Sequence, residues 1–207
     1  MSGIVLLDNQ DSFVYNLVDA LRDFDATVYR NTVPASRVLD AEPDLIVLSP
    51  GPGYPADAGS MMELIDAAQG RIPVLGICLG FQALVEHFGG RVQPCGPVHG
   101  ASISMELEPA GINSGLFSGL TTDDSPGADG HRVPRVPVAR YHSLGTVDMP
   151  VGMHSLARTD TQLGRVVMAA RSDDYKSIGL QFHPESILTP AGPLIIERCV
   201  AELMKGR

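Results

Sequence analysis

The sequence predicts an α/β protein with a doubly wound, mostly parallel sheet flanked by helices, and with extra antiparallel strands in its second half. In the first half, continuous apolar runs such as Leu45–Leu48 are typical of strands covered on both faces. These runs alternate with segments whose apolar residues follow helical spacing. In the second half, short β-like runs follow one another between turn residues, a pattern that favours extended strands over helices.

The elements of the first half can be placed one after another along the chain. The helix expected after the first strand has Asp11 or Ser12 at its N-cap, and Gly89 ends the last helix of this half. The expected strands are Ile4–Leu7, Ala26–Arg30, Leu45–Leu48 and Val74–Ile77, and the expected helices are Asp11–Phe24, Ser60–Ala68 and Leu79–Phe88.

The second half contains the remaining expected strands and one closing helix. The strands are Val98–Leu107, Leu144–Val147, Met153–Arg158, Arg165–Arg171 and Ile178–Phe182, and the helix is Thr189–Met204. Between them, Thr121–Pro137 has no periodicity and is rich in Pro, Gly and Asp, which predicts a surface loop. No internal repeat is visible, so residues 1–207 are expected to form a single domain.

Composition restricts the classes of function that the chain can have. With 207 residues, of which 44% are hydrophobic, the chain can bury a sizeable core. A formal net charge of −9 disfavours nucleic acid and anionic membrane surfaces as partners. Three cysteines, an odd and sparse set, together with no signal-like or membrane-spanning run, favour a cytoplasmic protein. No Cys/His cluster has metal-ligand spacing, so no metal site is expected.

The strongest chemical signal is Cys78, which directly follows an expected buried strand and directly precedes an expected helix. Gly76 and Gly80 flank it, an arrangement typical of a nucleophile elbow. The free N–H groups at a helix N-terminus favour a negative charge, and the thiolate is the reactive form of cysteine. A buried structural cysteine is the commoner fate of a lone cysteine, but the glycine pair and a suitable downstream histidine favour a nucleophile.

A second signal lies near the C-terminus, where His183 and Glu185 flank Pro184. A residue before proline is biased towards extended backbone, so His183 and Glu185 are expected to project to the same side. A carboxylate beside an imidazole fixes the tautomer and stabilises the charged ring. Together with Cys78 this predicts a nucleophile, a general base and an orienting group. The competing interpretation is a surface ion pair at a strand end.

A third signal is the turn Ser49–Gly53, which directly follows the strand Leu45–Leu48. Its glycines and prolines make a stiff turn with exposed backbone, and the N–H groups of Gly51 and Gly53 could help to hold an oxyanion. An ordinary strand-to-helix turn is the simpler interpretation, and this motif alone does not decide between them.

These three motifs resemble those of the class I glutamine amidotransferases, the triad glutaminases. The matching blocks are Ser49–Gly53, Gly76–Gln82 and Phe182–Ser186. Two more blocks, Asp8–Phe13 and Arg140–Leu144, resemble the glutaminase components of chorismate-using enzymes, namely anthranilate synthase component II and the glutaminase of aminodeoxychorismate synthase.

The resemblance implies that Cys78 attacks the side-chain amide of glutamine, with His183 and Glu185 completing the triad. It implies an oxyanion site formed by the N–H groups of Leu79 and the Gly51-Pro52-Gly53 turn. It also implies substrate contacts from Gln82, Ser143 and Leu144, although position on the helix alone favours a solvent-facing Gln82.

The same resemblance implies a partner, a large chorismate-binding synthase subunit that receives ammonia from this chain. No cofactor is expected in this chain, and the magnesium of the acceptor reaction is expected in the partner. The expected pathway is anthranilate formation for tryptophan; alternatives are folate synthesis through aminodeoxychorismate, a subunit shared by both enzymes, or a catalytically silent subunit that only stabilises a synthase.

Two features depart from the subfamily pattern. Phe81 replaces the usual His after the elbow glycine, and Ala101 replaces a usual Lys. The Thr121–Pro137 loop is longer than usual, so we consider that it contacts the synthase or gates the glutamine pocket, with a tolerated insertion as the alternative.

Overall fold

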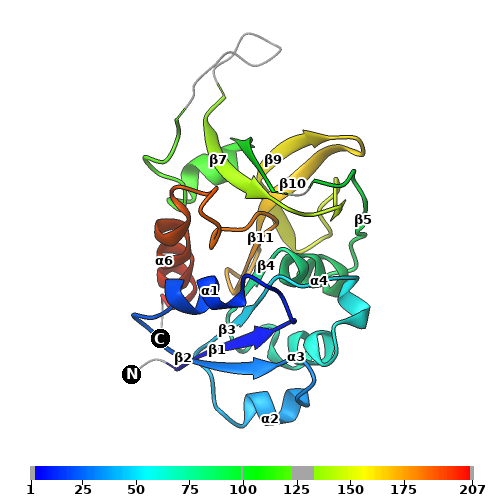
Figure 1. The fold of residues 1–207 in the computed structure, drawn as a ribbon, viewed down its shortest axis with the longest axis vertical. Coiled ribbons are helices and arrows are strands. Elements are labelled where there is room, and N and C mark those ends of the chain that lie inside the picture. Colours follow the sequence, from blue (N-terminus) through cyan, green and yellow to red (C-terminus); the bar gives the residue numbers. More distant parts are fainter. Residues whose placement is uncertain (1–2, 99, 123–132, 206–207) are drawn as a thin grey trace.

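The computed structural model describes residues 3–98, 100–122 and 133–205. Within these ranges, nine strands form one sheet in the order β2-β1-β3-β4-β11-β10-β9-β6-β7, and β5 pairs with β8 separately (Figure 1). The strands are β1 (Gly3–Asp8), β2 (Asp25–Arg30), β3 (Leu45–Leu48), β4 (Val74–Ile77), β5 (Gln93–Pro94), β6 (Ala101–Leu107), β7 (Arg135–Arg140), β8 (Leu144–Gly145), β9 (Met153–Thr161), β10 (Gly164–Ser172) and β11 (Ser177–Leu180). The helices are α1 (Val14–Ala20), α2 (Ala35–Leu39), α3 (Met61–Ala68), α4 (Leu79–His87), α5 (Pro109–Asn113) and α6 (Gly192–Leu203), with a 3₁₀ turn η1 (Pro55–Asp57).

The strands β2, β1, β3, β4 and β11 are parallel, and all four residues of β3 and of β4 are buried. Their side chains alternate between two cores, since Leu45 and Val47 lie in one core whereas Ile46 and Leu48 lie in the other. Each strand therefore needs apolar residues at every position, which explains its continuous apolar run.

Helices cover both faces of the parallel half of the sheet (Figure 1). On one face, α1 and α6 contribute Leu17, Leu21, Ile196 and Cys199 to the core. On the other face, the second core contains residues of α2, α3 and α4. The sheet is thus doubly wound, and the carboxyl ends of its parallel strands meet at one edge, where ligand sites of such folds lie.

The rest of the large sheet is antiparallel: β10 pairs with both β11 and β9, and β6 pairs with both β9 and β7. Because β11 joins β4 in parallel on one side and β10 in antiparallel fashion on the other, it connects the two halves of the sheet. The predicted fold class is confirmed, including the antiparallel strands in the second half.

The main error of prediction concerns β7. Residues 135–137 were expected in the Thr121–Pro137 loop, but they begin a strand at the edge of the sheet. Pro137 disguised this strand, and an edge strand tolerates a proline because one side of its backbone needs no ladder hydrogen bond. Residues 123–132 of the expected loop lie outside the described residues.

Other boundaries differ more modestly from the expectations. The short elements α2, α5, η1 and β5 were not predicted, and the strand expected from Val98 begins at Ala101. The closing helix begins at Gly192, because residues 189–191 form turns. Within the described part of the chain, no helix is long and apolar enough to cross a membrane, and no group of three or more His, Cys, Asp or Glu residues is placed to hold a metal ion.

Candidate active site

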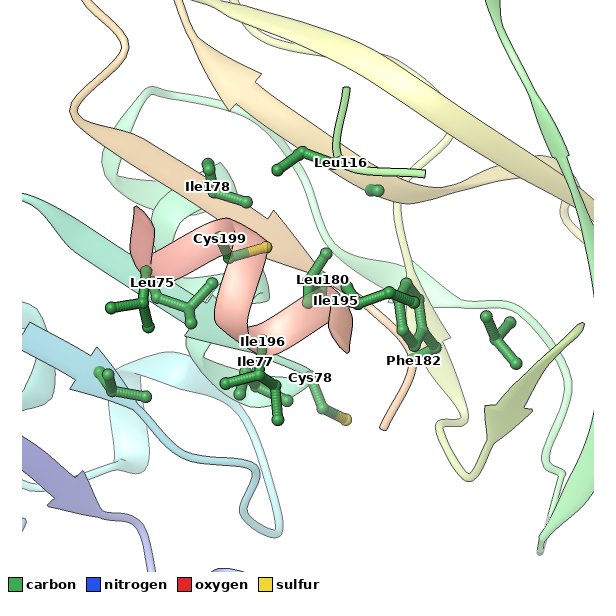
Figure 2. Packing of buried hydrophobic residues seen from close by; sticks show 14 of the residues in the cluster. Leu75, Ile77, Cys78, Leu116, Ile178, Leu180, Phe182, Ile195, Ile196 and Cys199 are labelled. Atoms are coloured by element: carbon green, nitrogen blue, oxygen red, sulfur yellow. The ribbon is translucent and has the colours of Figure 1, made fainter. Parts of the chain in front are cut away.

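Cys78 is the single residue between β4 and α4, and its backbone is strained. Its φ of 52° and ψ of −101° are unusual for a residue with a side chain. Two hydrogen bonds enforce this conformation: the Cys78 N–H donates to the Leu180 carbonyl at 2.7 Å, and the Gln82 N–H donates to the Cys78 carbonyl at 3.0 Å. Figure 2 shows Cys78 directly beyond Ile77, at the end of the packed core. The predicted elbow is therefore present as a strained strand-to-helix turn.

The glycines on either side of Cys78 are required by close packing. A Cβ on Gly76 would lie 2.5 Å from the Gly80 carbonyl oxygen, and a Cβ on Gly80 would lie 2.5 Å from the Leu48 carbonyl oxygen. Helix α4 thus approaches β3 and β4 more closely than any side chain at these positions would allow. In the facing strand β11, Gly179 pairs with Gly76 and makes room for the buried ring of Phe81.

His183 and Glu185 form a buried pair just beyond the end of β11. The His183 Nδ1 and the Glu185 Oε1 are 2.6 Å apart, and the side chains are 4% and 0% exposed. The surface ion pair considered as an alternative is therefore wrong. Because the carboxylate accepts from Nδ1, the other ring nitrogen of His183 is free to exchange a proton with a reacting group.

A ring of hydrogen bonds fixes the backbone of His183 against β7. The His183 N–H donates to the Ala139 carbonyl at 3.1 Å. The Ala139 N–H donates to the Thr189 hydroxyl at 2.9 Å, and that hydroxyl donates to the His183 carbonyl at 2.7 Å. The strand missing from the sequence-based prediction is therefore the support of the predicted histidine.

Cys78 and His183 line a common cavity of about 210 Å³. Its lining also includes Gly51, Pro52, Gly53, Gln82, Ser143 and Leu144, all expected to bind substrate. A larger hollow of about 1010 Å³ lies between α1 and residues 184–197, but neither cysteine nor histidine is among the described residues that line it. We therefore place the site in the smaller cavity, because that cavity contains the nucleophile and the imidazole.

Two of the expected site residues do not line this cavity. The side chain of Glu185 lies behind His183, where an orienting carboxylate belongs. The side chain of Leu79 is buried in the core and packs near Gly51, so only the backbone of Leu79 can face a substrate.

The Ser49–Gly53 turn is held close to the elbow by Asn9. The Asn9 N–H donates to the Ser49 hydroxyl at 2.8 Å, and its side-chain amide donates to the Ser49 carbonyl at 2.9 Å. A Cβ on Gly51 would lie 2.7 Å from the Asn9 carbonyl oxygen and 2.9 Å from the Leu79 side chain. The turn is thus packed directly against the beginning of α4.

The electrostatics of the site favour a charged His183. Burial alone would lower the pKa of its imidazole, but the charge of Cys78, a hydrogen bond with Cys78 and the carboxylate of Glu185 outweigh burial and raise the pKa well above its usual range. His142, a second imidazole on the cavity wall, behaves oppositely. Burial and the nearby Arg140 charge lower the pKa of His142 to about 3, so this ring is neutral near neutral pH.

Sequence reasoning assigned no role to several residues of the site. Asp11, Phe13, Tyr141 and His142 also line the cavity, and the rings of Phe13 and Tyr141 lie 5.8 Å and 5.0 Å from the His183 ring. These residues fall in the two blocks Asp8–Phe13 and Arg140–Leu144, so the signal was present without an assigned function. The aromatic rings limit how far the imidazole can turn.

Gln82 and Gln181 form a buried amide pair beside the nucleophile. The Gln82 Nε2 donates to the Leu144 carbonyl and to the Gln181 Oε1, both at 3.2 Å. The Gln181 Nε2 donates to the Cys78 sulfur at 3.8 Å. Gln82 is only 4% exposed, so the solvent-facing position favoured by its place on the helix is wrong. Gln181 was not predicted as a site residue.

Comparisons with known proteins agree with this architecture. Two solved structures share the fold over nearly the full chain. A putative GMP synthase protein from Thermoplasma acidophilum has a TM-score of 0.77 at 23% identity, and the match covers 98% of this chain and 94% of the other. A glutamine amidotransferase from Thermotoga maritima has a TM-score of 0.70 at 15% identity, and the match covers 99% of both chains.

Sequence relatives are closer. The anthranilate synthase component 2 of Corynebacterium glutamicum is 57% identical over 208 residues, which cover 99% of each chain. A pyocyanine-specific anthranilate synthase component 2 of Pseudomonas aeruginosa is 42% identical over 204 residues, covering 95% of this chain and 92% of its own. The family model described as glutamine amidotransferase class-I matches residues 5–203, and the chain therefore belongs to the class I glutamine amidotransferases.

Proposed function

We propose that this chain is the glutaminase subunit of an anthranilate synthase, and that it releases ammonia from glutamine through a thioester on Cys78. The observation that carries the proposal is the strained Cys78 elbow opening into the same cavity as the buried His183–Glu185 pair. The relatives named as anthranilate synthase component 2, which match nearly the full chain, support the assignment to this synthase.

The proposed reaction has two stages. The Cys78 thiolate attacks the side-chain amide carbon of glutamine, and the carbon–nitrogen bond breaks as the His183 imidazolium gives a proton to the departing ammonia. A water then gives a proton to His183 and attacks the thioester, which releases glutamate and regenerates the thiolate. Glu185 holds the ring through Nδ1 in both stages.

The oxyanion formed in each stage requires hydrogen-bond donors. Helix α4 begins directly after Cys78, and the first N–H groups of a helix have no partner within the helix. We propose the N–H of Leu79 and an N–H of the Gly51–Gly53 turn as these donors, because the turn packs against the beginning of α4. One such donor typically contributes about 2.7–4 kcal/mol to lowering the barrier.

We further propose that Gln82, Ser143 and Leu144 contact the substrate glutamine. Both N–H groups of the Gln82 amide already have acceptors in the protein. The Gln82 Oε1 is therefore the atom that we assign to the substrate, as an acceptor for one of its N–H groups.

Ammonia released into water becomes ammonium, which is a poor nucleophile, so this chemistry is useful only beside a docked acceptor enzyme. The partner that we propose is a larger, chorismate-binding synthase subunit, with the magnesium of the acceptor reaction in the partner rather than in this chain. A cytoplasmic location and a single glutaminase domain complete the proposal.

The test uses the full chain together with the large subunit that co-purifies with it from the native cell. In Cys78→Ser, we expect glutamine-dependent synthesis to fall to background, whereas synthesis from added ammonium stays at the parent rate because the partner is intact. The product, anthranilate or aminodeoxychorismate, identifies the synthase.

Cys95 offers a matched control, because it is a second buried cysteine that lies outside the lining of the cavity. Cys95→Ser is expected to keep glutamine-dependent synthesis. Full glutamine-dependent turnover by Cys78→Ser would show that Cys78 is not the nucleophile. If the parent chain releases no glutamate with its partner bound, the silent-subunit interpretation replaces ours.

A further inference from the structure

A chain of three hydrogen bonds connects the wall of the cavity to the proposed nucleophile. It runs from the Leu144 carbonyl to the Gln82 amide, from that amide to Gln181, and from Gln181 to the Cys78 sulfur. Gln181 is completely buried and follows β11 directly. The two-stage reaction proposed for Cys78 gives this residue no task.

The chain of hydrogen bonds has only one consistent direction. The Leu144 carbonyl can only accept, so the Gln82 side chain must present its NH₂ group to it. The second N–H of that group then points to the oxygen of Gln181 at 3.2 Å. Once the Gln181 oxygen is occupied in this way, its NH₂ group faces the Cys78 sulfur. The orientation of the Gln181 amide is thus fixed by its hydrogen-bond partners.

The backbone holds Gln181 in this place independently of its side chain. Its N–H donates to the Met168 carbonyl of β10 at 2.9 Å, and the preceding Leu180 carbonyl accepts from the Cys78 N–H at 2.7 Å. The same short stretch of chain therefore contacts both the backbone and the sulfur of Cys78. A buried N–H donor beside sulfur favours the thiolate over the neutral thiol, because hydrogen bonds to charged groups are the stronger ones.

We propose that Gln181 stabilises the Cys78 thiolate and aims it into the cavity, with Gln82 holding the Gln181 amide in the donating orientation. Gln181 is then a catalytic residue for this reaction, since it contacts the reacting atom. The inference rests on the proposed role of Cys78 as the nucleophile. It also gives Gln82 a second task besides contact with substrate.

The test measures the rate of alkylation of Cys78 by iodoacetamide in the full chain, as a function of pH, alongside glutamine-dependent turnover. Cys95 and Cys199 are 1% and 0% exposed, so Cys78 is the accessible thiol, and Cys78→Ser gives the background rate. In Gln181→Met, which keeps the length of the side chain but removes the donor, we expect alkylation at neutral pH to slow about tenfold. The midpoint of the rate–pH curve should move to higher pH.

Gln69→Leu is the matched control. It removes an amide that accepts a hydrogen bond from Ser177 at 3.2 Å, at the opposite end of β11. Its alkylation profile and turnover should equal those of the parent chain. A merely structural role of Gln181 would lower the folded fraction without moving the pH midpoint of the folded protein.

If Gln181→Met does not fold, Gln181→Glu provides the second variant. It keeps the shape and the oxygen that accepts from Gln82, but it places an acceptor beside the sulfur, so alkylation near neutral pH should slow at least as much. An unchanged midpoint and a rate within about twofold of the parent value, in either folded variant, would overturn the role of Gln181. Failure of the Cys78 proposal looks different, since Cys78→Ser would then keep glutamine-dependent turnover.

Discussion

Thr189 is the residue on which the position of the predicted general base depends. Its hydroxyl accepts from the Ala139 N–H at 2.9 Å and donates to the His183 carbonyl at 2.7 Å, and the residue is 2% exposed. Replacing Thr189 by Val keeps the shape of the side chain and deletes both hydrogen bonds. The perturbation therefore removes polar partners without creating a cavity.

The expected loss follows from what each former partner has left. The His183 carbonyl keeps the Ser186 N–H as a donor at 3.3 Å, so its cost is small. The Ala139 N–H, in a buried residue, loses the partner described for it. An unsatisfied buried donor costs about 1–3 kcal/mol, so Thr189→Val should lower the free energy of unfolding by about 2–3 kcal/mol.

The assay is urea unfolding followed by circular dichroism, together with glutaminase turnover of the same preparations. Turnover should fall with little change in KM, because the mutation displaces the imidazole and leaves the proposed substrate contacts in place. Thr189→Ser is the matched control, since it keeps the hydroxyl and should retain most of both properties. A loss of stability below about 0.5 kcal/mol, with parent turnover, would refute the reasoning.

Three further outcomes test other parts of the site. Gly80→Ala puts a Cβ 2.5 Å from the Leu48 carbonyl oxygen, and this overpacking should cost about 1–3 kcal/mol in thermal unfolding while slowing turnover; parent values would show that α4 can shift freely. Glu185→Gln removes a carboxylate that raises the pKa of His183, so NMR titration should find a lower pKa in the variant. The stability contributed by protonated His183 is complete below a pH of about 6.5, the unfolded pKa, and is lost as pH rises through the raised folded pKa, so stability–pH curves of parent and variant should converge at alkaline pH.

The parts of the site that the sequence predicted are those whose chemistry is encoded locally. Cys78 was recognisable because the strand, the two glycines and the helix around it are contiguous. The face shared by His183 and Glu185 follows from their separation by one proline. In both cases a few neighbouring residues determine the backbone, and the structure places Cys78 and His183 in one cavity.

The residues that were missed depend on contacts between distant segments. Gln181 reaches Cys78 only because β11 lies beside β4, and strand order cannot be obtained from periodicity. The burial of Gln82 was misjudged for a related reason. Every residue from Leu79 to Val85 is buried, because α4 is covered on the side away from the sheet as well, whereas an isolated helix would have a polar face.

The register between β4 and β11 explains how residues so far apart in the chain become reaction partners. Ile77 pairs with Leu180, so the residues that follow, Cys78 and Gln181, leave the sheet at the same edge, and His183 follows two residues later. In a parallel pair, a slip of one residue would turn both motifs to opposite faces. The paired glycines Gly76 and Gly179 let α4 and Phe81 pack directly onto these two strands, which resists such a slip. The strain at Cys78 is therefore maintained by the core, and a substitution in that core changes the reactivity of the sulfur without touching it.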